Sequence, residues 1–171
     1  MLSKARVLQT IKDGKRKLGI EDFMFEAKCS EKPSGVGKRA EIFILPDNRV
    51  EIVLYHDATL FSVRHELCHA KLFRMGVPLT NTEKDLELFP NPDDYLRMVA
   101  IVEWYINELQ KRVFHEYYAV DDVGTPRPPP FAELPELPGE RFTEEQIKRI
   151  AEVAKKGGKR LRISTPKRQV H

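Results

Sequence analysis

The first half of the chain shows one helical and several strand-like patterns of apolar residues. Val7, Ile11 and Leu18 fall on one face of a predicted N-terminal helix, and Gly19 suits its end. Aromatic and β-branched residues then concentrate in three short segments separated by turn-forming sequences, at residues 23–30, 39–46 and 49–55. The pattern predicts three strands, which we expect to pair as an antiparallel meander.

Two longer helical patterns follow the predicted strands. The segment 57–76 begins at an N-cap residue, Asp57 or Thr59, and ends at Gly76. After a polar, turn-rich stretch, residues from about 93 to 120 run without glycine or proline and predict a single long helix. We therefore expect an α+β fold in which a small, mostly antiparallel three-stranded sheet packs on these two helices.

Prolines crowd the region after the long helix, so regular structure is not expected there. A last helix starts with a capping box at Thr143 and Gln146 and precedes a basic tail. The chain thus divides into a domain at 1–122, a proline-rich connector at 123–142, and a C-terminal helix with a basic tail at 143–171. We expect few core contacts to cross the connector.

Composition narrows the expected location and partners. Of 171 residues, 41% are hydrophobic, and no apolar run reaches the length of about 20 that crosses a bilayer. The first residues lack the apolar core of a secretory signal, so we expect a cytoplasmic location and no membrane partner. The net charge of +3 argues against a nucleic-acid protein, although the basic tail leaves contact with nucleic acid open. The two cysteines, Cys29 and Cys68, indicate no disulfide framework.

Residues His65 to His69 read HELCH and lie within a predicted helix. Because residues four apart share one helix face, His65 and His69 can present two imidazoles to one metal ion. Glu66 then lies at the flank, where a carboxylate can accept the proton of a metal-activated water. This is the HExxH arrangement of zinc metalloproteases. The alternative, two ordinary histidines beside a solvated glutamate, stays open.

A catalytic zinc site needs a third protein ligand. The position where a further histidine would mark the metzincins is Met75, which excludes that class. Glu103 lies on the apolar face of the long helix, four residues after Val99 and three before Ile106. A zinc ion would neutralise an acid buried there. Glu108 is the second candidate.

Further residues are candidates for supporting roles. Asn107 lies one turn after Glu103, where its amide is expected to hold a metal ligand in place. His115 and Tyr117 are candidates for stabilising the negative charge of a tetrahedral intermediate, although both lie far along the helix from Glu103. Cys68 is expected to pack as a small apolar side chain and not to bind metal.

The sequence HELCH, followed 34 positions after His69 by EWYIN, resembles the gluzincin zinc peptidases, whose pattern is HExxH and a glutamate on a downstream helix. Among gluzincins it is similar to the archaeal minigluzincins and to the zinc peptidases that cleave phage repressors. The opening HELCHA also resembles the SprT-like proteases. These take a third histidine from a nearby stretch, whereas the downstream histidines here are His115 and His171.

The resemblance implies a zincin-like fold and Zn²⁺ held by His65, His69 and Glu103, with Glu66 as general base. It also implies that an edge strand pairs with an extended peptide, and residues 49–55 are expected to be that strand or its neighbour. The expected function is a zinc-dependent endopeptidase acting on a protein or peptide substrate. The alternative is a non-catalytic or latent metal-site protein that acts as a regulatory binding module for nucleic acid or a protein partner.

Overall fold

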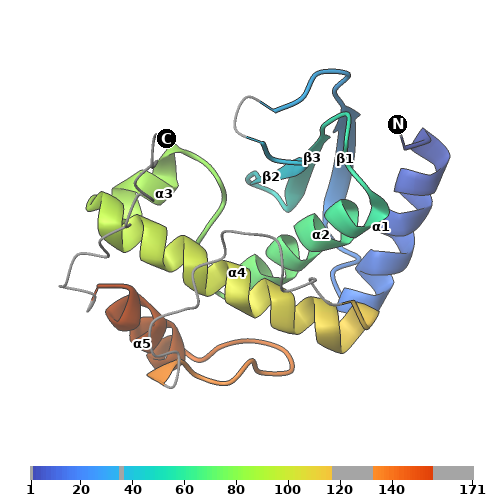
Figure 1. Ribbon diagram of the computed structural model, residues 1–171. Coiled ribbons are helices and arrows are strands. Elements are labelled where there is room, and N and C mark those ends of the chain that lie inside the picture. Colours follow the sequence, from blue (N-terminus) through green and yellow to red (C-terminus); the bar gives the residue numbers. More distant parts are fainter. Residues whose placement is uncertain (1, 35–36, 117–132, 156–171) are drawn as a thin grey trace, which may run out of the picture.

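The computed structural model describes residues 2–34, 37–116 and 133–155 of the chain (Figure 1). It confirms the predicted α+β class, with helices packed around a small three-stranded sheet. The elements are α1 (Lys4–Leu18), β1 (Met24–Cys29), β2 (Ala40–Ile44), β3 (Arg49–Leu54), α2 (Leu60–Arg74), α3 (Glu83–Leu88), α4 (Pro92–Phe114) and α5 (Glu144–Lys155).

The sheet has the strand order β1-β3-β2, with β1 parallel and β2 antiparallel to β3. The prediction of an antiparallel meander is therefore wrong: the sheet is mixed, and β1 pairs with β3 instead of its sequence neighbour β2. The central strand β3 buries its apolar face, with Val50, Ile52 and Leu54 at most 2% exposed, whereas the edge strand β1 is mostly exposed. The connection of residues 30–39 between β1 and β2 is long enough for β2 to lie at the opposite edge of the sheet, so that β3 can pair between them.

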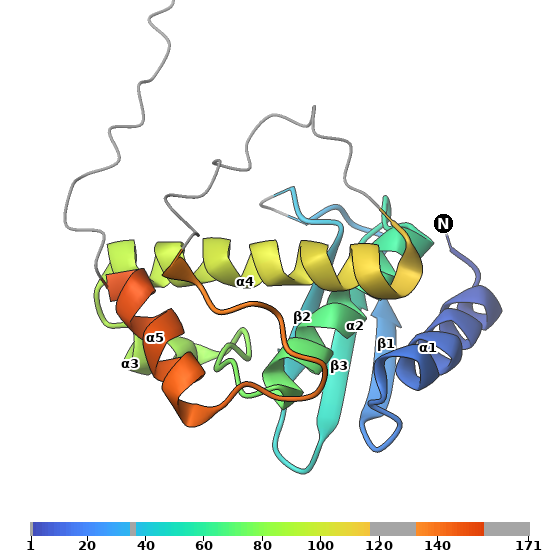
Figure 2. The same cartoon turned by 90° about the horizontal axis from the view of Figure 1, so that it is seen from below.

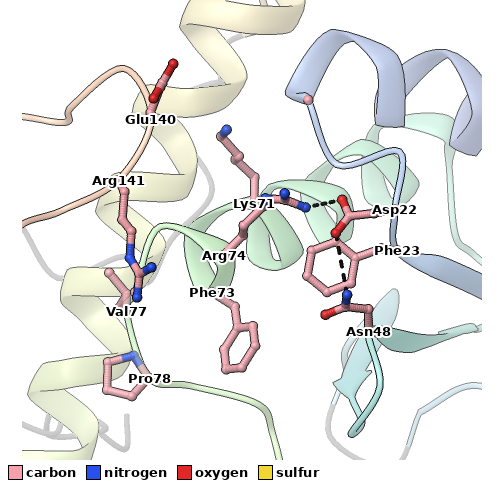
Figure 3. A pocket seen from close by; sticks show the side chains of 12 residues that line it. Asp22, Phe23, Asn48, Lys71, Phe73, Arg74, Val77, Pro78, Glu140 and Arg141 are labelled. Atoms are coloured by element: carbon pink, nitrogen blue, oxygen red, sulfur yellow. Dashed lines mark hydrogen bonds and ion pairs between the residues drawn. The ribbon is translucent and has the colours of Figure 1, made fainter.

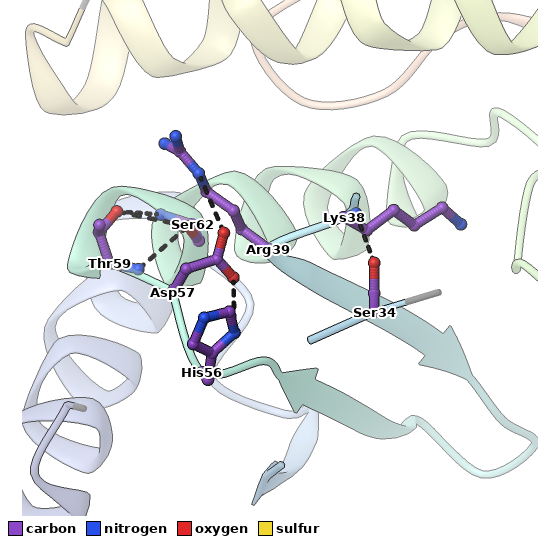
Figure 4. Close-up of polar contacts among 7 residues, drawn as sticks. All are labelled: Ser34, Lys38, Arg39, His56, Asp57, Thr59 and Ser62. Carbon is purple, nitrogen blue, oxygen red and sulfur yellow. Dashed lines mark hydrogen bonds and ion pairs between the residues drawn. The ribbon is translucent and has the colours of Figure 1, made fainter. Parts of the chain in front are cut away.

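Helix α2 lies at the centre of the molecule and packs against α1, α4, β2 and β3 (Figure 2). Of the two predicted N-cap residues, Thr59 caps the helix and forms a capping box with Ser62 (Figure 4). Asp57 lies outside the helix, 3.8 Å from Arg39. The helix ends just before Gly76, whose φ of 103° is rarely adopted by residues with a side chain. Local sequence therefore sets both ends of the helix that carries HELCH.

Helix α4 is shorter than predicted. It ends at Phe114, because His115 adopts a left-handed φ of 56° and its N–H donates to the carbonyls of Gln110 and Lys111. The predicted continuation is wrong at residues 115 and 116, and its last residues, 117–120, lie outside the described part of the chain. The short helix α3, where a polar loop was expected, precedes α4.

Residues 133–155 pack against α4 and complete the core. Phe142 is 3% exposed and meets Tyr105 edge to face, with ring centroids 5.2 Å apart. The Tyr105 hydroxyl donates a hydrogen bond of 2.6 Å to the carbonyl of Pro135. Helix α5 starts with the predicted capping box and buries Ile150. The expectation of few core contacts is therefore wrong for the described part of the proline-rich connector.

Phe142→Ala should lower the free energy of unfolding by about 3–5 kcal/mol, the usual cost of deleting a buried phenylalanine side chain. Denaturant-induced unfolding measures this change. Lys148→Ala, on the exposed side of α5, is the matched control and should change stability by less than about 0.5 kcal/mol. A loss below about 1 kcal/mol for Phe142→Ala would contradict a role for this segment in the core.

Candidate metal centre

Three side chains from α2 and α4 meet in one cluster. Nε2 of His65 lies 3.3 Å from one carboxylate oxygen of Glu103, and Nε2 of His69 lies 3.4 Å from the other. The potential ligand atoms of the three residues lie within 4.8 Å of one another. No other group of three histidine, cysteine or acidic side chains gathers in this way among the described residues. The structure thus brings together the three residues that the sequence predicts as ligands, and they could hold a metal ion.

Helix geometry explains why these side chains converge. His65 and His69 lie one turn apart on α2, and their rings meet edge to face with centroids 5.0 Å apart. Helix α4 packs against α2 (Figure 2). This packing brings the carboxylate of Glu103 to the two rings. The side chains of His65, His69 and Glu103 are only 12%, 20% and 34% exposed. Their charges are therefore partly withdrawn from water and interact strongly.

The cluster perturbs the ionisation of its members. Burial alone would lower the pKa of His65, but its hydrogen bond to Glu103 and the charge of that carboxylate outweigh burial and raise the pKa to about 9. Burial would likewise raise the pKa of Glu103, but the hydrogen bonds from His65 and His69 outweigh it and hold this pKa well below its usual range. Without a metal, the cluster is an ion pair between a carboxylate and protonated imidazole.

Glu66 is a buried acid beside the cluster. It is 5% exposed and lines the same cavity as the two histidines and Glu103. Burial raises the pKa of its carboxyl group, and the negative charge of Glu103 adds to this effect, whereas the charges of His69 and His65 oppose it. Glu66 therefore lies next to the three-residue group without belonging to it, which is the place expected for a proton acceptor.

Gln110 supports the cluster and was missed by the sequence reasoning. It is 1% exposed, and its Oε1 lies 3.2 Å from Nδ1 of His65. If Nε2 of His65 binds a metal, Nδ1 carries the ring proton and donates a hydrogen bond to Oε1 of Gln110, which fixes the tautomer and the ring orientation. A signal was available, because Gln110 lies seven residues after Glu103, two turns along the same side of α4.

The predicted supporting residues lie in different surroundings. Asn107 has a buried Oδ1 without a hydrogen-bond partner among the described residues, and the observed bond to His65 comes from Gln110. His115 closes the end of α4 and does not line the cavity at the cluster. Tyr117 lies outside the described residues.

Two other residues considered as metal ligands, Glu108 and Cys68, also lie outside the cluster. Glu108 pairs with Lys111 at 2.8 Å on a partly exposed side of α4. Cys68 is fully buried, and burial raises the pKa of its thiol far above the usual value. It therefore packs as a small neutral side chain, as expected.

A cleft of about 480 Å³ opens at the cluster between β2, α2 and α4. Its polar lining includes the cluster and Glu66, and its apolar lining comes from several elements. The residues that line it are Gly37–Ile42, Phe61, Ser62, His65, Glu66, His69, Leu79–Asn81, Asp85, Tyr95, Val99, Val102 and Glu103. The candidate metal ligands and Glu66 therefore share one cleft with residues of β2 and of the segment 79–81.

A larger hollow of about 850 Å³ lies at the C-terminal end of α2 (Figure 3). Arg74 forms an ion pair there with Asp22, and Asp22 also accepts a hydrogen bond of 3.5 Å from Asn48. Within the part of the chain that the structure describes, no metal-binding group lies in this hollow. The chemistry-bearing side chains therefore gather in the smaller cleft.

Glu103→Ala should weaken binding of a divalent metal by roughly 100-fold or more, since losing even an outer hydrogen-bond partner of a ligand typically costs 10- to 100-fold. Equilibrium dialysis with Zn²⁺, followed by elemental analysis, measures the affinity and the stoichiometry. Glu108→Ala removes a carboxylate from the same helix and should leave the affinity unchanged. If Glu108→Ala loses the metal and Glu103→Ala keeps it, the third ligand is misassigned.

Metal affinity should also rise with pH. A metal binds neutral imidazole, and His65 carries a proton below a pKa of about 9, so binding below that pH releases this proton. The apparent affinity should increase up to about tenfold per pH unit between roughly pH 6 and 8, and level off above about 9. Titration calorimetry in buffers of different ionisation enthalpy counts the protons released. Affinity that does not change over this range would contradict the assignment of His65.

Comparison with known proteins found no matching family model, no matching curated protein and no matching solved structure. Among the residues that the structure describes, no helix is both long enough and apolar enough to span a membrane. The geometry of the cluster and its cleft is therefore the observation on which a functional proposal rests.

Proposed function

We propose that the protein is a zinc-dependent peptidase of the gluzincin type. The observation that carries the proposal is the meeting of His65, His69 and Glu103 in one cleft with the buried acid Glu66 beside them. Two imidazoles and one carboxylate are a donor set typical of catalytic zinc, with one position left for water or substrate. When bound there, zinc would supply the Lewis acidity that activates water and polarises a peptide carbonyl.

Glu66 is the proposed general base. Its carboxylate would accept the proton of the attacking water and then deliver it to the amine that leaves when the peptide bond breaks. Burial, which raises the pKa of this carboxyl, favours the step in which Glu66 holds the proton. Gln110 would keep His65 in the tautomer that presents Nε2 to the metal.

Strand β2 is the proposed support for the substrate. It is an edge strand, it lines the cleft with Ala40, Glu41 and Ile42, and β3 (the predicted segment 49–55) is its central neighbour. An extended peptide added along this edge would gain main-chain hydrogen bonds and pass beside the cluster. The apolar lining from Phe61 and Val99 suits apolar side chains of such a peptide.

Glu66→Gln should keep the fold and the bound metal but lower peptide hydrolysis by about 100- to 10,000-fold, because an amide cannot accept the proton of the water. Cleavage of a peptide library by the zinc-loaded protein, followed by mass spectrometry, measures this. Glu108→Gln is the matched control and should cleave at the wild-type rate. A Glu66→Gln protein as active as wild type would refute the role of Glu66. Metal binding without any hydrolysis by wild type would favour the non-catalytic regulatory alternative.

A further inference from the structure

The loop that follows α2 is held firmly against the edge of β2. The carbonyl of Thr80 accepts a hydrogen bond of 3.3 Å from the backbone N–H of Ile44. Asp85, 2% exposed, accepts hydrogen bonds from the Thr80 N–H at 2.9 Å, the Thr80 hydroxyl at 3.0 Å and the Thr82 N–H at 3.2 Å. A buried carboxylate with this many donors fixes the loop conformation. Residues 79–82, here called the end loop, therefore form a rigid wall.

The ladder between β2 and β3 shows which backbone groups of β2 face outward. At one end of the ladder the N–H of Tyr55 donates to the carbonyl of Arg39, and at the other end the N–H of Leu45 donates to the carbonyl of Arg49. Since hydrogen-bonded pairs alternate along an antiparallel ladder, the odd-numbered residues of β2 point their backbone groups at β3. The even-numbered residues then point theirs at the free edge. Of these, Ile44 is already bonded to the end loop, whereas Ala40 and Ile42 have no such partner among the described residues.

The open part of the edge is consequently short. Ala40 and Ile42 are two positions apart, which in a strand corresponds to roughly 7 Å. The lining of the cleft agrees with this limit, because it includes β2 residues up to Ile42 but not Phe43 or Ile44, and it continues with the end-loop residues 79–81. A peptide that pairs with β2 beside the cluster meets the end loop as soon as it passes Ile42.

We propose that the end loop closes one end of the substrate cleft, so that the enzyme cleaves peptides near one of their chain ends and not in the middle of a long extended segment. This inference rests on the proposed peptidase function and names its substrate class, which differs from that of the endopeptidase expected from the sequence. Thr80 and Asp85 are the residues that determine this specificity. Their role is to limit the length of the bound segment on one side of the scissile bond.

The test uses the zinc-loaded full chain and two sets of peptides that share a central sequence. One set has free, short ends, and the other carries six-residue Gly-Ser extensions at both ends. Mass spectrometry locates the cleaved bond. We expect cleavage within about two residues of one end, and at least a tenfold lower kcat/KM when that end is extended, since the bound strand has room for roughly two residues there.

The outcomes separate the two proposals. Equal kcat/KM for the central bond in short and extended peptides would overturn the closed cleft while leaving the peptidase function intact. No hydrolysis of any peptide, with zinc bound, would overturn both.

The variant Asp85→Ala removes the acceptor that holds the end loop. If this variant folds, the ratio of kcat/KM for extended peptides to kcat/KM for short peptides should rise by about tenfold. An unchanged ratio in a folded Asp85→Ala protein would contradict the role of the end loop, and the wild-type peptide series decides the question if this variant does not fold.

Discussion

The contact of the Glu103 carboxylate with the side chains of His65 and His69 is the interaction on which the centre of this structure depends. A carboxylate on the inner side of α4 is costly unless polar partners lie close to it, and α2 supplies two imidazoles from consecutive turns, 3.3 Å and 3.4 Å from the carboxylate oxygens. The packing of α4 on α2 is therefore coupled to the protonation of His65. A bound metal ion would take the place of the imidazole proton as the positive charge beside Glu103, and it would hold the same two helices together.

A buried cluster of ionisable side chains usually adds little to the stability of a fold. Its presence therefore points to function more than to stability. Removing charges from water costs free energy that a buried ion pair recovers only partly, and apolar side chains of similar size would often be at least as stable. The same two helices otherwise contribute apolar side chains to the core, among them the fully buried Val63, Leu67 and Ile106. The proposed chemical role would account for two histidines, two acids and the buried amide of Gln110 lying together at this place.

The edge of β2 illustrates how the fold restricts a surface that would otherwise be open. Exposed edge strands pair readily with other chains, and proteins usually cover or shorten them. Here the end loop takes the outward N–H of Ile44, whereas Ala40 and Ile42, which line the same cleft as the cluster, have no backbone partner on that side within the described part of the chain. The part of the edge that remains free is thus the part that lies at the proposed catalytic side chains. The end loop belongs to the connection between α2, which carries the histidines, and α3.

The sequence by itself determined the features that depend on neighbours within one or two helical turns. The helix around HELCH, its Thr59 cap, its end before Gly76 and the shared face of His65 and His69 all follow from local geometry. Glu103 was also predictable, because an acid on an apolar helix face requires a partner.

Other features were decided only by the tertiary structure. The parallel pairing of β1 with β3 and the packing of Phe142 on Tyr105 join segments far apart in the chain. The bond from His65 to Gln110 and the closure of β2 by Thr80 do the same. Periodicity identifies which face of an element is buried, but it does not identify the element that covers that face. That choice depends on how all the apolar faces can be buried at once, which is a property of the assembled core.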